Sequence, residues 1–286
     1  MCMNFKDPNQ DLHDLPKFET SEVYNFDDPV EKKFSKELKQ INTDGYAILD
    51  LNQPYEIYKT INNKIDNKIF DGNPKLNPKY YHYNENPRVI EAWRDIKEIV
   101  DLARDSDVLD FLECVYKRRP IPFSTINFIK SSEQPLHSDY MHFSSKPERY
   151  LTGVWFALED IDINSGPLQV IPKSHKLSIT TLEELSQDIP KNTKQLKENY
   201  TEYEEHVKKV VKQNNLDSKK ITIKKNQCLI WSANLLHGGS PIHDETLTRK
   251  SLVVHYHYEN CLYYNPGFSK LSKNIMAERK IEEITY

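Results

Sequence analysis

The stretch PLHSDYMHF (residues 135–143) lies between two short runs that are typical of strands, FSTINFIK (123–130) and RYLTGVWFAL (149–158). Its polar residues His137 and Asp139 are separated by a single residue. Residues i and i+2 of an extended segment point to the same side, so both side chains can reach one ligand. Taken alone, this stretch fits either half of a metal site or a solvated polar turn.

More strand-like runs follow, at residues 167–172, 219–231 and 249–258. Pro, Gly, Asn, Asp or Ser bounds each run, which is typical of antiparallel strands. The pattern predicts a mainly β fold with helical support, in which residues 120–258 form a β-sandwich or barrel and helices cover one side.

The first third of the chain is predicted to be mainly helical. After an irregular arm (1–28), helical spacing of apolar residues begins behind Asp28 and Pro29, and a short strand, GYAILDL, follows at 45–51. Two further helices are predicted, at 53–70 and at 86–118, the second interrupted near Asp105. Residues 29–119 therefore form a helical support.

Two segments complete the organisation, which we interpret as one domain over residues 1–286. Residues 177–220 form an insert rich in Glu and Lys, whose second half has the spacing of an amphipathic helix. It is either a lid over the site or an external helical excursion. Residues 259–286 form a C-terminal tail.

Composition narrows the function classes. The net charge of −4, with both signs interspersed, gives no field that would favour nucleic acid or anionic lipid. The four cysteines lie far apart and form no CxxC pair, so we expect reduced thiols. No signal-peptide core and no apolar run of about 18 residues occurs. We therefore expect a cytoplasmic protein that acts on a small molecule, with no nucleic acid and no membrane as partner.

A third metal ligand is predicted in NLLHGGSP (234–241), where His237 precedes two glycines that permit close backbone approach. Two histidines and one carboxylate form the facial triad that holds non-haem iron and leaves other positions open. Arg249 opens an apolar strand, where a buried guanidinium is costly unless it meets an anion. An edge-strand arginine in a surface ion pair is the alternative. Strand alternation places His255 on the same face as Arg249.

Three stretches together carry a family resemblance: PLHSDYMHF, YLTGVWFALEDIDINSGPLQVIPKSHK and IWSANLLHGGSPIHDETLTRKSLVVHYHYE. In order and spacing they resemble the phytanoyl-CoA dioxygenase-like branch of the Fe(II)/2-oxoglutarate oxygenases. The resemblance implies a double-stranded β-helix, a cupin-like jelly roll, with N-terminal helices packed on the major sheet. It covers most of the chain, from about residue 41 into the 250s.

The resemblance also implies roles for single residues. His137, Asp139 and His237 correspond to the iron ligands, and Arg249 corresponds to the clamp on the distal carboxylate of 2-oxoglutarate. The positions of two further residues suggest contact with this co-substrate: Lys130 and Ser240. The implied enzyme uses Fe(II), 2-oxoglutarate and O2, releases CO2 and succinate, and hydroxylates an aliphatic C–H bond. The carboxylate at position 139 favours hydroxylation, or a related desaturation or ring closure, over halogenation.

The sequence offers five candidates for the substrate side of the site, and these are Tyr140, His142, Gln169, Asn234 and His255. Two other functions are compatible with the same pattern. One is a protein or peptide hydroxylase, which would have an open groove. The other is a non-catalytic jelly-roll binding protein, although all four key residues are present.

Overall fold

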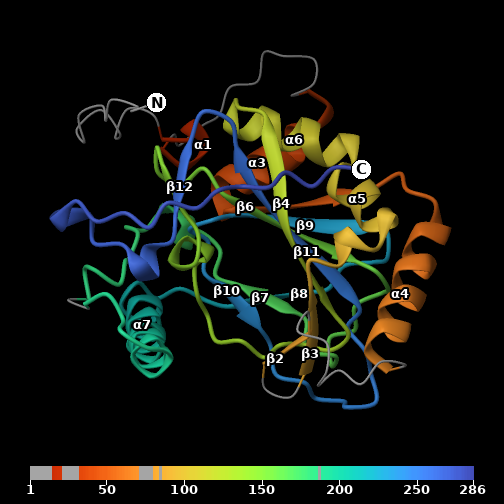
Figure 1. Ribbon diagram of the computed structural model, residues 1–286. Helices are drawn as coiled ribbons and strands as arrows, with labels where there is room; N and C mark the ends of the chain where they lie inside the picture. The colour runs from red at the N-terminus through yellow and green to blue at the C-terminus, as the bar shows by residue number, and fades with distance from the viewer. Residues whose placement is uncertain (1–14, 21–31, 71–79, 84–85, 186–187) are drawn as a thin grey trace.

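The computed structural model describes residues 15–20, 32–70, 80–83, 86–185 and 188–286 (Figure 1). Its centre is a seven-stranded antiparallel sheet in the order β1-β9-β6-β11-β4-β3-β2. The strands are β1 (Tyr46–Asp50), β2 (Tyr80–Tyr83), β3 (Asn86–Ile90), β4 (Pro120–Phe128), β6 (Thr152–Ala157), β9 (Gln227–Ser232) and β11 (Ser251–Tyr258).

A smaller antiparallel sheet packs against one face of the large one, in the order β10-β7-β8. Side chains from both sheets form one apolar cluster that includes Trp155, Val170 and Leu229. The predicted jelly roll is confirmed. The remaining strands are β7 (Leu168–Val170), β8 (Lys219–Ile221), β10 (His237–Gly239) and the pair β5 (Ser144–Lys146) and β12 (Leu262–Tyr264).

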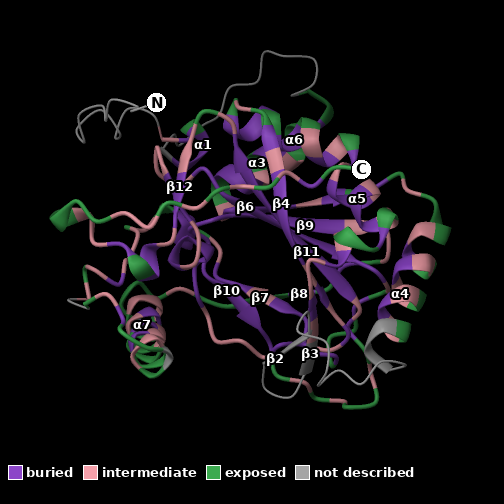
Figure 2. Ribbon diagram, viewed as in Figure 1, coloured by how far each residue is buried: buried purple, intermediate pink, exposed green. Residues whose placement is uncertain are grey.

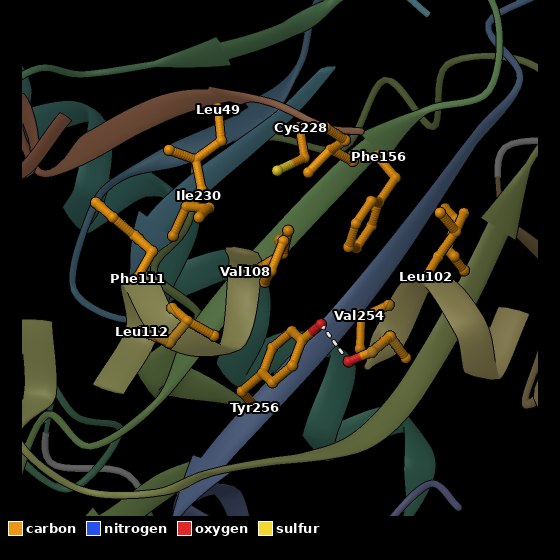
Figure 3. Packing of buried hydrophobic residues seen from close by; sticks show 14 of the residues in the cluster. Leu49, Leu102, Val108, Phe111, Leu112, Phe156, Cys228, Ile230, Val254 and Tyr256 are labelled. Carbon is orange, nitrogen blue, oxygen red and sulfur yellow. Dashed lines mark hydrogen bonds between the residues drawn. The ribbon is translucent and has the colours of Figure 1, made fainter. Parts of the chain in front are cut away.

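Helices cover the other face of the large sheet, as the burial pattern in Figure 2 shows. Alternation divides each central strand: Trp155 faces the small sheet, whereas Val154 and Phe156 face the helices. Tyr256 is fully buried there, and its hydroxyl donates to the backbone oxygen of Ala103 over 2.9 Å (Figure 3). The covering helices are α3 (Ser35–Asp44), α4 (Tyr55–Phe70), α5 (Lys97–Ala103) and α6 (Ser106–Tyr116).

The N-terminal predictions hold with two corrections. The predicted start of the first helix, at Asp28 and Pro29, lies outside the described residues. Within the arm predicted to be irregular, α1 (Lys17–Thr20) is helical and buries Phe18 in the core. Residues 86–90, predicted as helix, form strand β3 because they pair with β4. The predicted interruption is correct, since Asp105 caps α6 by accepting from two backbone amides.

Both late segments are ordered where described. The insert forms α7 (Thr193–Gln213), which packs on Met141, Ile171 and Leu236 beside the small sheet. The tail contains β12 and then returns to the helical side, where Ile284 is fully buried. Cys114, Cys228 and Cys261 form no disulfide among the described residues. Within the same residues, no helix is both long and apolar enough to cross a bilayer.

Candidate metal centre and substrate cavity

His137, Asp139 and His237 converge on one point. The first two lie in the segment between β4 and β5, and His237 is the first residue of β10. Oδ1 of Asp139 lies 3.9 Å from Nε2 of His137 and 3.7 Å from Nε2 of His237. All three ligand atoms lie within 4.8 Å of one another. This arrangement is compact enough for all three residues to bind a single ion.

Backbone geometry fixes the two histidines. The amide of each donates to the carbonyl oxygen of the other over 2.9 Å, which joins His137 to His237 as a β-bridge. The following glycine makes this approach possible, since a Cβ on Gly238 would lie 2.6 Å from the backbone oxygen of Gln134. The sequence predicted this close approach at the glycines, and the segment forms the short strand β10.

The histidine rings present the correct nitrogen. Nδ1 of His137 lies 2.8 Å from the carbonyl oxygen of Pro135, and Nδ1 of His237 lies 3.0 Å from that of Leu235. A carbonyl only accepts, so Nδ1 carries the proton and the lone pair of Nε2 points into the site. Burial lowers the pKa of His137 to about 3, which keeps its ring neutral at physiological pH.

The second oxygen of Asp139 is held separately. Oδ2 accepts a 2.7 Å hydrogen bond from Nε1 of Trp231 and lies 3.5 Å from Nε2 of His255. Burial by itself would raise the pKa of this carboxyl group, but the neighbouring His237 and His255 hold it below its ordinary value. Asp139 is therefore a buried, charged and oriented ligand. Together with the two imidazoles of His137 and His237 it fits a divalent transition metal that retains open positions.

The ligands open into a cavity of about 370 Å³. This volume is near the lower end of the range for small-molecule sites. Its wall includes Arg249, Arg88, Phe143, Tyr200 and Arg279. The space beside the metal centre is thus lined by aromatic rings and by several cationic groups.

Arg249 is only 2% exposed, and its Nε has no hydrogen-bond partner among the described residues. Its guanidinium lies 5.3 Å from the ring of Phe128 and 5.4 Å from that of Trp155. Burial, assisted by the charge of Arg88, lowers its pKa to about 9. The predicted alternative, an arginine in a surface ion pair, is wrong. A buried guanidinium without a carboxylate partner favours an anionic ligand.

The structure does not bring Lys130 and Ser240 into the cavity wall. Nζ of Lys130 donates to the carboxylate and the backbone oxygen of Glu245 over 2.8 and 2.7 Å. Ser240 is fully buried behind the wall, and its hydroxyl has no hydrogen-bond partner among the described residues. The suggested contacts of both residues with a co-substrate therefore gain no support from the geometry.

The five substrate candidates divide into two groups. His142 and His255 line the cavity. The other three lie outside its wall, because their polar atoms bind within the protein. The hydroxyl of Tyr140 donates to Ser145, the amide of Asn234 donates to the backbone oxygens of His175 and Leu177, and Gln169 bonds Ser218 and Gly239.

Several residues of the cavity wall were not predicted as site residues, and Trp231, Arg88 and Arg279 are three of them. Trp231 was seen only as the end of an apolar strand, although a buried indole N–H usually needs an acceptor. Arg88 stood in a segment predicted as helix, and it reaches the wall because β3 pairs with β4. Arg279 comes from the tail, and its surroundings contain no pattern that would have indicated it.

The insert supports the metal segment directly. Tyr203 of α7 accepts a 3.0 Å hydrogen bond from the amide of Ser138, which stands between two metal ligands. Tyr200, one turn earlier, contacts Nδ1 of His142 over 3.1 Å. Helix α7 therefore contacts the segment that carries two of the metal ligands, and a lid function of the insert stays a prediction.

Comparison with known proteins finds relatives that are named phytanoyl-CoA dioxygenase. The chain is 23% identical over 184 residues to the human (Homo sapiens) protein named phytanoyl-CoA dioxygenase, peroxisomal, covering 61% of this chain and 50% of that protein. The rat (Rattus norvegicus) protein of that name is 26% identical over 196 residues, covering 63% and 53%. The chain therefore spans about half the length of the curated relatives it matches.

Solved structures share the fold. The non-heme alpha ketoglutarate dependent carbocyclase SnoK from nogalamycin biosynthesis superposes with a TM-score of 0.64 at 14% identity, covering 91% of this chain and 98% of that one. EctD from S. alaskensis with 2-oxoglutarate and 5-hydroxyectoine gives 0.63 at 15%, covering 91% and 88%. The family model for phytanoyl-CoA dioxygenase (PhyH) matches residues 33–251. This chain belongs to the phytanoyl-CoA dioxygenase family.

Proposed function

We propose that this protein is an Fe(II)- and 2-oxoglutarate-dependent oxygenase that hydroxylates an aliphatic C–H bond of a small metabolite. The observation that carries the proposal is the convergence of His137, Asp139 and His237 on one wall of a cavity that also contains the buried Arg249. Family membership and the fold support it. When bound, Fe(II) and 2-oxoglutarate supply the activation of O2, with release of CO2 and succinate and transfer of one oxygen atom to the substrate.

The residues of the chain have separate tasks in this proposal. The triad holds the metal on one face and leaves positions for the co-substrate and O2. Arg249 provides parallel N–H donors for the distal carboxylate of 2-oxoglutarate. Arg88, whose charge already acts on Arg249, adds positive potential at the same end of the cavity. Trp231 and His255 hold Oδ2 of Asp139, so that Oδ1 faces the two histidine ligands and would be free to bind the metal.

A small-molecule substrate is favoured over a peptide because the cavity is small and helix α7 packs beside it. The co-substrate occupies part of the roughly 370 Å³, and α7 packs beside the metal segment. A peptide hydroxylase requires an open groove instead.

The test is succinate formation by the purified chain with Fe(II), 2-oxoglutarate and O2. We expect slow uncoupled turnover in the wild type and its loss in His137→Ala, together with weaker Fe(II) binding. His243→Ala, which removes an exposed histidine, is the control and should keep both properties. Absence of both iron binding and turnover in the wild type would favour the non-catalytic jelly roll. Unchanged Fe(II) affinity in His137→Ala would show that the triad is assigned wrongly.

A further inference from the structure

The cavity has a second cationic region, provided by the C-terminal tail. Arg249 lies two residues before strand β11, and its side chain points to the same side of the sheet as that of His255 in β11. His255 lies beside Asp139 at the candidate metal centre. His257, two residues further on, stacks on Phe123 with ring centroids 3.8 Å apart. The guanidinium of Arg279 lies 5.5 Å from the ring of Phe123. Arg249 and Arg279 therefore lie towards opposite ends of the cavity, with the metal ligands between them.

The backbone holds Arg279 in place. Its amide donates to the carbonyl oxygen of Tyr263 over 2.7 Å, and the amide of Asn265 donates to that of Ala277 over 2.9 Å. Tyr264 and Glu278 form a β-bridge between these bonds. Residues 277–279 thus pair with residues 263–265 within the tail, and the Arg279 side chain reaches the cavity wall.

The guanidinium of Arg279 is half-buried, and no hydrogen bond or ion pair holds it among the described residues. It contacts the rings of Phe143 and Phe123, at 4.6 and 5.5 Å from their centroids. The charge of Glu91 acts on it through space, but the carboxylate oxygens of Glu91 accept hydrogen bonds from Trp93 and from the amide of Thr125. Ring contacts leave the N–H donors of an arginine unsatisfied.

The path from Arg279 to the metal ligands is short and lined by aromatic rings. Phe143 lies between them, with its ring centroid 5.2 Å from that of His255 and 6.3 Å from that of His142. His142 in turn lies 5.6 Å from His137. A ligand whose anionic group binds Arg279 would place its apolar body along Phe143 and its far end near the metal.

We propose that Arg279 binds the carboxylate of the substrate, so that the enzyme acts on small monocarboxylic acids with an apolar body. The inference rests on the proposed function, because it assumes that 2-oxoglutarate fills the end of the cavity at Arg249. One guanidinium matches one carboxylate in charge and in bidentate geometry. The rings of Phe143 and Phe123 match the apolar body.

The experiment uses the chain loaded with Fe(II) and 2-oxoglutarate under argon, where no turnover occurs. The visible absorption band of the chelate reports the loaded state, and its change on addition of a second compound reports binding beside the metal. The probes are butyrate, hexanoate, octanoate, phenylacetate, phenylpropanoate and phenylbutyrate, each paired with its primary amide. Each pair differs in charge and little in shape.

We expect at least one carboxylate to bind the wild type about ten-fold more tightly than its amide. Arg279→Gln should remove this difference, and Arg279→Lys should keep part of it. Lys280→Gln, which removes the neighbouring exposed charge, is the matched control and should keep all of it. Thermal unfolding of each variant checks that the tail still folds.

The outcomes separate the two proposals. If the chelate band does not form in the wild type, the proposed function fails and this inference fails with it. If the band forms but no carboxylate binds more tightly than its amide, the role of Arg279 is overturned and the proposed function stands. The role of Arg279 is also overturned if a folded Arg279→Gln variant keeps the preference for carboxylates.

Discussion

The indole Nε1 of Trp231 donates a 2.7 Å hydrogen bond to Oδ2 of Asp139, while Oδ1 of the same carboxylate faces both histidine ligands. One tryptophan of the large sheet thus sets the rotation of a metal ligand that comes from a loop. Outer partners of this kind are typically worth a factor of about 10 to 100 in metal affinity.

Trp231→Phe should therefore weaken Fe(II) binding by about 10- to 100-fold, because an aromatic side chain remains but the indole N–H donor is lost together with part of the buried ring system. Anaerobic titration with Fe(II) measures the effect. Trp155→Phe is the control, since Nε1 of Trp155 has no hydrogen-bond partner among the described residues. Equal losses in the two variants would argue against the orienting role of Trp231.

Gly153→Ala should disturb Asp139 indirectly, by displacing Trp231. A Cβ at this position would lie 2.2 Å from the nearest ring atom of Trp231, so the indole must move. We expect a loss of about 1 to 3 kcal/mol in the free energy of unfolding, and weaker Fe(II) binding as well. Urea unfolding and Fe(II) titration measure the two effects. Gly267→Ala, where the nearest neighbour would be 3.2 Å away, should cost less. A stable Gly153→Ala variant with wild-type affinity would refute the argument.

Removal of one hydroxyl from α7 should loosen the metal segment. Tyr203→Phe leaves the buried amide of Ser138 without its acceptor, at a cost of about 1 to 3 kcal/mol in the free energy of unfolding. Fe(II) affinity should fall as well, because Ser138 joins two ligands. Tyr200→Phe removes the other hydroxyl, which contacts a side chain and not the segment's backbone. If Tyr200→Phe impairs metal binding more than Tyr203→Phe does, the support lies elsewhere on α7.

The affinity for 2-oxoglutarate should depend on the donor geometry at position 249. Arg249→Lys keeps the charge but loses the parallel pair of donors, so we expect about ten-fold weaker binding, and a greater loss in Arg249→Gln. Titration of the Fe(II)-loaded chain with 2-oxoglutarate under argon measures both. Lys250→Gln, on the opposite face of the strand, is the control. Wild-type affinity in Arg249→Gln would exclude the clamp.

Stability without metal should fall as the pH decreases from about 6.5 to 4. Burial lowers the pKa of His137 to about 3 and those of His142 and His175 to about 4, from 6.5. Between these values the unfolded chain binds protons that the folded chain does not, so acid favours unfolding. A histidine whose pKa is lower by one in the folded chain than in the unfolded chain contributes about 1.4 kcal/mol to this loss.

Urea unfolding at several pH values measures this slope. His175→Gln should be less stable than the wild type at pH 7, because the imidazole contact with the backbone oxygen of Asn42 is lost, but its slope should be shallower. His243→Gln, an exposed position, controls for removal of one histidine. A slope in His175→Gln as steep as in the wild type would contradict the assignment.

Local patterns predicted the parts of this protein that depend on local geometry. The i, i+2 spacing of His137 and Asp139 and the alternation behind Arg249 are properties of extended chain, and the structure has both groups in the cavity. The helix at 53–70 and the interruption at Asp105 follow from periodicity and capping, and they are also present.

What failed depends on partners distant in the sequence. Residues 86–90 have helical neighbours but become a strand because β4 pairs with them. Lys130 is near the cavity in sequence, but Glu245 binds its amine. Arg279 reaches the cavity only because residues 277–279 fold back and pair with residues 263–265. These three outcomes depend on tertiary contacts between distant residues, and the residue pattern of a short segment does not reveal such contacts.

The reciprocal backbone bonds between His137 and His237 also have a kinetic meaning. These residues are a hundred positions apart, and their pairing closes a long loop that contains β6, β7, β9 and the whole of α7. Contacts of such large sequence separation form slowly, because closing a long loop costs chain entropy before any contact compensates for it. The binding site is therefore completed only when the two ends of this loop meet. The rate at which a refolding chain binds metal should report the rate of this step.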